Sequence, residues 1–166
     1  MSYLTNGCIC LILGPLLIGF GGLLTTLGWN EISNYSNRKT LITNAKRELE
    51  QNQKYLMDMK NSFEQISKLD KTYLLPTFHY NAIQAIQISP LFSKKDDNLL
   101  SATSSYLYNV NPVNNSVLKL NNIFSGTEQS LQDKKNTYIN FYSSPLMQKF
   151  RQKHEGLNRQ LLKLKY

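Results

Sequence analysis

The stretch that decides the fold reads ITNAKRELEQNQKYLMDMKNSFEQI, residues 42–66. Its apolar side chains recur at alternating intervals of three and four residues, and one asparagine fills the only gap. This spacing defines a heptad seam on one face of a helix, which we predict over residues 37–69. The seam is expected to form a packing or partner surface. Its members are Ile42, Ala45, Leu49, Asn52, Leu56, Met59, Phe63 and Ile66.

A second seam lies near the C-terminus, after an interruption at Ser144-Pro145. Two seams from opposite ends of the chain, each with one polar residue, predict helices that pack side by side. Asn52 in the first seam either fixes the register of packing or reflects the abundance of Asn. His154 in the second is expected to be a bundle residue rather than a metal ligand. The apolar members of the second seam are Met147, Phe150, Leu157, Leu161 and Leu164.

Turn and cap signals divide the chain between the two seams. Thr77 follows a proline and is predicted to cap a short helix that ends near Ile88. Asp96 or Asp97 is predicted to cap a third helical region, which Pro112 should kink or divide. No stretch shows the alternation of β-branched residues that is typical of a strand. The predicted fold class is therefore all-α, with an N-terminal transmembrane helix, a long helix and an antiparallel helical bundle.

The transmembrane prediction depends on residues 8–29, which read CICLILGPLLIGFGGLLTTLGW and contain no charged side chain. As a helix, such a stretch is roughly 33 Å long and matches the hydrocarbon core of a bilayer. Trp29 and Tyr35 follow where interfacial aromatic residues are common. We therefore predict a membrane anchor with its exit over residues 1–36 and a helical, water-facing domain over residues 37–166.

Two alternatives to an uncleaved span are a cleaved signal and a lipid anchor. A cleaved secretory signal is disfavoured because no basic region precedes the apolar run and because the run is long. A lipid on Cys8 is disfavoured because the apolar run follows this cysteine instead of ending at it, so a buried thiol is the favoured interpretation.

Basic residues just after the span predict its orientation. Arg38, Lys39, Lys46 and Arg47 follow it, whereas only the terminal amine precedes it. The positive-inside rule then places the C-terminal domain in the cytoplasm of a single-pass membrane protein. The sequons at 34–36 and 114–116 would not meet the glycosylation machinery there.

The formal net charge of +8 is concentrated near the C-terminus, where residues 127–166 hold eight basic and three acidic side chains. A basic helix attracts phosphate groups, and for a tethered domain anionic lipid is a nearer partner than nucleic acid. The competing interpretation is a solvated basic face without a ligand. The residues of the predicted anionic-ligand surface are Lys149, Arg151, Lys153, Arg159 and Lys163.

Enzymatic chemistry has little support in the residues. The two histidines, His79 and His154, lack further ligands at the spacing of a metal site. No catalytic triad spacing and no glycine-rich phosphate loop is present. We therefore expect no catalytic, cofactor-binding or metal-binding residues and no enzyme activity.

The order of these features resembles a widespread group of uncharacterised prokaryotic single-span membrane proteins. The resemblance rests on NRKTLITNAKRELEQNQKYL at 37–56, LPTFHYNAIQAI at 75–86 and SSYLYNVNPVNNSVLKLNN at 104–122, after the apolar N-terminal stretch. It implies the single-span topology and brings no functional residue with it.

The leading functional hypothesis is a non-enzymatic, membrane-anchored helical interaction or scaffold protein, a subunit or accessory of a larger assembly. Its expected partners are the lipid bilayer and another protein or a second copy of itself. The first alternative is a membrane-tethered binder of anionic lipid or, less favoured, nucleic acid through the basic C-terminal helix. The second alternative is a small membrane-active effector.

Overall fold

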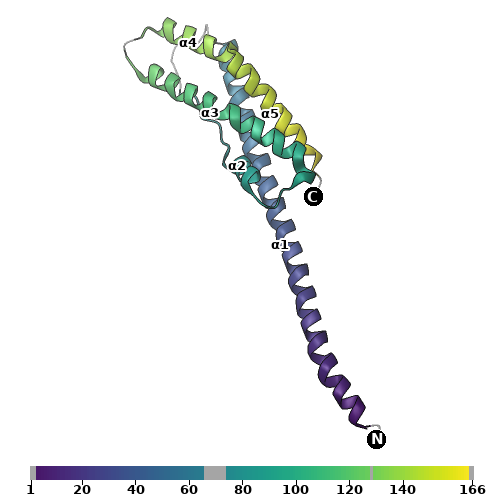
Figure 1. The fold of residues 1–166 in the computed structure, drawn as a ribbon. Helices are drawn as coiled ribbons and strands as arrows, with labels where there is room; N and C mark the ends of the chain where they lie inside the picture. Colours follow the sequence, from purple (N-terminus) through teal and green to yellow (C-terminus); the bar gives the residue numbers. More distant parts are fainter. Residues whose placement is uncertain (1–2, 66–73, 128, 165–166) are drawn as a thin grey trace. The chain divides into compact units, whose positions relative to one another are not determined.

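The structure is a computed structural model that describes residues 3–65, 74–127 and 129–164, with side chains from residue 25 onward. Within these ranges it contains five α-helices and no strand, so the predicted all-α fold is confirmed (Figure 1). The helices are α1 (Tyr3–Glu64), α2 (Asn81–Ile88), α3 (Asp97–Ser125), α4 (Leu131–Ser143) and α5 (Pro145–Lys163), with the 3-10 helix η2 (Lys94–Asp96) before α3.

The chain divides into two compact units, Met1–Lys39 and Thr40–Tyr166. In the first unit, most of the predicted span lies outside the residues whose side chains are described. Where side chains are described, none of the helices is both long enough and apolar enough for a bilayer crossing. Trp29 and Tyr35, the predicted interfacial aromatic residues, are both exposed.

In the second unit, the part of α1 that belongs to it packs antiparallel to α5. From the N-terminal side of this part of α1, Lys46 donates to the carbonyl of Leu164 at 3.3 Å. One turn later, the Leu49 carbonyl lies 3.1 Å from the Nε2 of His154. The order of these contacts is reversed along α5, which is the signature of antiparallel neighbours. The two predicted seams therefore meet in one hydrophobic core.

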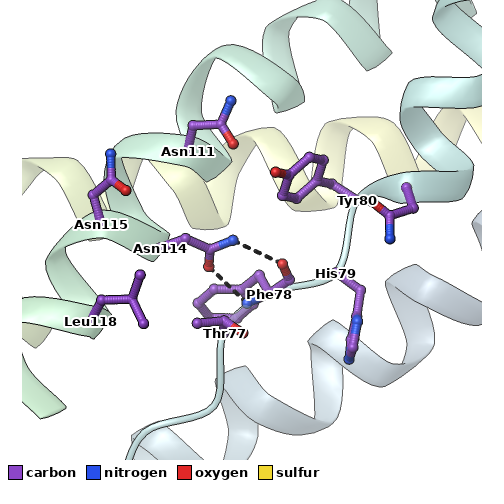
Figure 2. A pocket seen from close by; sticks show the side chains of 9 residues that line it. Thr77, Phe78, His79, Tyr80, Asn111, Asn114, Asn115 and Leu118 are labelled. Carbon is purple, nitrogen blue, oxygen red and sulfur yellow. Dashed lines mark hydrogen bonds between the residues drawn. The ribbon is translucent and has the colours of Figure 1, made fainter.

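Residues 74–80 between α1 and α2 form neither helix nor strand, and two asparagines of α3 hold their backbone. Asn121 accepts a hydrogen bond from the Leu75 N–H and donates one to the Leu75 carbonyl, both at 2.8 Å. Asn114 makes the same pair of bonds to Phe78, at 2.7 and 2.9 Å (Figure 2). Each amide thus satisfies both backbone groups of one residue, as a neighbouring strand would.

A third asparagine, Asn52 of α1, holds the same segment from the other side. Its carbonyl oxygen accepts from the His79 N–H at 2.9 Å, and its amide donates to the His79 carbonyl at 2.7 Å. The amide also donates to the Tyr106 hydroxyl at 2.9 Å. Burial raises the pKa of this hydroxyl, which therefore stays protonated and can donate in turn to the His79 carbonyl.

The predicted cap at Thr77 is wrong, since α2 begins only at Asn81. The asparagine contacts hold the preceding backbone extended, so a helix cannot start at Thr77. The first turn of α2 is capped from outside by Glu48 of α1, whose carboxylate accepts from the N–H groups of Ala82 at 2.9 Å and Ile83 at 3.2 Å. A negative charge at this end is favoured by the helix dipole.

Helix α3 continues through Pro112, so of the predicted kink or division the division is wrong. A proline inside a helix withdraws one N–H from the carbonyl four residues earlier, here that of Tyr108. Tyr108 is 77% exposed, so water can donate a hydrogen bond to this carbonyl in place of the missing N–H. Asp96 stands at the N-cap position of α3, as predicted, but its side chain makes no capping hydrogen bond to that helix. The carboxylate instead accepts from the Ser93 N–H at 3.1 Å, in a capping box around η2.

The predicted interruption at Ser144-Pro145 is confirmed. Ser144 ends α4 and also caps α5, where its hydroxyl accepts from the Met147 N–H at 3.3 Å. Pro145 is the first residue of α5, a position where a proline loses no hydrogen bond. This single residue pair therefore turns the chain from α4 into α5.

Candidate anion-binding groove

Helix α5 carries the five basic side chains of the predicted anionic-ligand surface, and the structure does not bring all of them together. Lys149 and Lys153, one turn apart, line a hollow shared with α3. Arg159 lines the adjoining hollow. The Arg151 guanidinium instead lies 4.6 Å from the centre of an aromatic ring on α4, and Lys163 is exposed in the last turn.

The two hollows have volumes of about 520 and 410 Å³ and share Ser101, Ser105 and Lys153. They therefore form one continuous feature, which we call the α3/α5 groove. It exists because α3 and α5 pack closely along their length and leave the edges of both helices facing each other at the surface. Its polar lining comes from Asn98, Ser101, Ser104, Ser105, Tyr108, Asn109, Lys149, Gln152, Lys153, Arg159 and Gln160.

The electrostatic character of the α3/α5 groove is positive. In the part of the chain that the structure describes, Lys149, Lys153 and Arg159 form no ion pair. The acidic residues of the two helices are Asp97 in the first turn of α3 and Glu155 on α5, and neither lines the groove. Amines beside serine hydroxyls offer charge and neutral donors together, a combination that suits phosphate oxygens.

Sequence reasoning found only the α5 half of this groove. Ser101, Ser105 and Tyr108 follow one another at intervals of four and three residues, so they share a face of α3. This spacing of hydroxyl groups was a visible signal, but small polar residues are common on any solvated helix face. Only the packing of α3 against α5 distinguishes this face from the others.

Six of the eight residues of the first predicted seam lie inside the protein's own core. Phe63 is half-buried and stacks on Tyr142 of α4, with ring centroids 4.6 Å apart. Ile66 lies outside the described residues. These side chains therefore pack within the chain itself. The seam residues whose exposed fraction is below a tenth are Ile42, Ala45, Leu49, Asn52, Leu56 and Met59.

His154 occupies the polar position of the second seam and is 1% exposed. Its Nε2 lies 3.1 Å from the Leu49 carbonyl, where a neutral imidazole can donate. Burial lowers the pKa of His154, against smaller opposing effects of this hydrogen bond and of Glu155. The folded protein therefore holds the imidazole neutral near pH 7 and resists its protonation.

Acidification is expected to destabilise the fold through His154. The unfolded chain takes up a proton near the ordinary value of 6.5, whereas the folded chain does so only at lower pH. The free energy of unfolding should then fall below pH 6.5, by at most about 1.4 kcal/mol per pH unit. Urea unfolding at pH 7.5, 6.5 and 5.5 measures this slope.

A matched pair of variants assigns the slope to one residue. His154→Leu should flatten the dependence over this range, because the buried titrating group is gone. His79→Gln, which changes the only other histidine, should keep it. An unchanged slope in the His154 variant would contradict the assignment.

The histidines and acidic residues of the described ranges do not form a metal site. No group of three or more His, Cys, Asp or Glu side chains is placed to hold a metal ion there. His79 is exposed, and its Nε2 lies 3.3 Å from the Tyr55 hydroxyl. The α3/α5 groove is therefore the candidate site that the geometry favours.

No protein-family model, no curated protein and no solved structure matches this chain.

Proposed function

We propose that this protein is a non-enzymatic, membrane-anchored helical interaction module that binds anionic groups through the α3/α5 groove. The observation that carries the proposal is the convergence of Lys149 and Lys153 with Ser101 and Ser105 in one hollow. Two amines one helical turn apart, beside hydroxyl donors, can engage the oxygens of one phosphate group. Such a site binds and positions a ligand, and it needs no chemical step.

Anionic lipid headgroups are the ligand class we propose. An apolar span at 8–29 would hold the domain beside them, and tethering raises the effective concentration of the headgroups at the groove. Within the second unit, Lys46 contacts Leu164 directly after α5, so the Arg159 end of the groove lies at the end where this unit begins. The basic residues after the span favour the cytoplasmic leaflet, where anionic lipids are enriched.

Neutralising the groove is expected to abolish most of this binding. The variant carries Lys149→Gln, Lys153→Gln and Arg159→Gln. Each basic side chain near an anionic surface contributes about 1 kcal/mol, so affinity should fall about a hundredfold. The measurement titrates full-length protein in neutral detergent with short-chain phosphatidylglycerol, at low and at high salt.

The matched control removes three positive charges at other places on the surface. Lys54, Lys95 and Lys119 are exposed and lie outside the groove, and their replacement by Gln should leave the affinity within about threefold of wild type. Equal losses in both variants would show a diffuse charge effect and would remove the groove from the proposal. Tighter binding of labelled single-stranded DNA than of the lipid would shift the ligand class to nucleic acid.

A further inference from the structure

Residues 74–80, which we call the extended segment, contact α3 with a regular spacing. A seven-residue spacing on the helix matches a three-residue spacing in the segment. Asn114 and Asn121 lie seven residues apart on the helix, a rise of about 10.5 Å. The residues they hold, Phe78 and Leu75, lie three apart, and three residues of polyproline II chain span about 9.3 Å. Pro76 between them suits this conformation. A heptad pair of asparagines can therefore hold every third residue of an extended backbone.

A second heptad pair, Asn115 and Asn122, lies on the neighbouring stripe of the same helix. Both side chains are exposed, and neither makes a hydrogen bond within the described part of the chain. Asn115 lines an open hollow of about 670 Å³ whose border includes Thr77 and Leu118. In Figure 2 two dashed lines join the Asn114 side chain to Phe78, whereas Asn115 beside it has none.

The chemistry of this stripe selects the occupant. Leu118 lies between the two asparagines along the helix and is 52% exposed, so it can contact an apolar side chain. Neutral amides donate and accept at once, which matches a peptide group better than an anion, which only accepts. An amide that bonds the N–H and C=O of one residue recognises backbone in a defined conformation, whatever the side chain.

We propose that Asn115 and Asn122 hold the backbone of an extended segment of a partner protein, at two residues three apart. The segment runs beside the chain's own extended segment, with an apolar side chain against Leu118. Proline is accepted between the two held residues, because no contact there needs an N–H. This surface is separate from the α3/α5 groove, so either can fail without the other.

The test uses the one sequence that α3 is seen to hold, a fluorescently labelled, end-capped peptide LLPTFHY, corresponding to residues 74–80. Full-length protein in neutral detergent is titrated against it and followed by anisotropy. Removal of four hydrogen bonds in the double variant Asn115→Ala, Asn122→Ala should weaken binding about tenfold or more. The control Asn44→Ala, Asn140→Ala removes two exposed amides elsewhere and should leave binding unchanged.

A second peptide separates backbone recognition from general adhesion. Methylation of the backbone nitrogens of its second and fifth residues removes the two N–H groups that the asparagines would accept from. This peptide should bind the wild type more weakly than the unmodified peptide does, because two of the four hydrogen bonds are lost. Equal binding of the two peptides, equal binding to wild type and double variant, or no binding at millimolar peptide would overturn the proposal.

Discussion

Replacing Asn52 by Leu is expected to lower the free energy of unfolding by about 2–4 kcal/mol. Leucine fills similar space but offers no hydrogen bond, so the His79 N–H loses its partner and the His79 carbonyl keeps only the 3.4 Å bond from the Tyr106 hydroxyl. The Tyr106 hydroxyl, buried with Asn52, loses its donor as well. The loss exceeds that of an ordinary hydrogen bond because one side chain serves three groups. Urea unfolding of the full-length protein in neutral detergent, followed by circular dichroism, measures it.

Two further variants give this prediction its controls. Gln53→Leu removes an exposed amide from the next position of α1 and should change stability by less than about 0.5 kcal/mol. Asn52→Asp keeps the acceptor for the His79 N–H but turns a carboxylate oxygen toward the His79 carbonyl, so it should also destabilise. A stability of the Leu variant equal to that of Gln53→Leu would show that Asn52 does not hold the segment.

Two arginines inside the proposed span are expected to release the protein from membranes. The change is Leu16→Arg with Leu17→Arg, at the middle of residues 8–29. Each arginine at a helix centre disfavours insertion by about 2.5–3.5 kcal/mol, so the pair outweighs the apolar contribution of several leucines. After an alkaline wash, wild type should stay in the membrane pellet and the variant should appear in the supernatant.

The control places the same two charges on the helical domain. Leu74→Arg with Ile88→Arg changes exposed apolar side chains and should leave the protein in the pellet. Intact wild-type chain in the supernatant would falsify the anchor, and a shortened chain there would identify a cleaved signal instead. A C-terminal tag that is digested when intact cells are treated with protease would contradict the cytoplasmic orientation.

The helical part of the fold was predictable because its signals are local. The spacing of Leu49, Leu56 and Met59 identifies a buried helix face within a few turns, whatever packs against it. The stop at Ser144-Pro145 is equally local, since serine caps and proline starts a helix. Both kinds of signal need only neighbouring residues, and the structure agrees with both.

What sequence reasoning missed depends on residues far apart in the chain. Thr77 has the local chemistry of a cap, but the backbone after it is held extended by Asn114, 36 residues beyond Phe78. The asparagine contacts were invisible because an Asn on a helix usually faces water, and only the fold shows which ones meet a backbone. The α3 side of the α3/α5 groove was missed for the same reason.

The hydrogen bond between Lys46 and Leu164 joins positions 118 residues apart, so the early part of the second unit lies beside the end of α5. Such a unit is suited to circular permutation. A short glycine linker could join its ends, and new termini could be opened elsewhere without a change in the packing. It could also be inserted whole into a surface loop of a host protein, since both junctions would fall at the same point on the host.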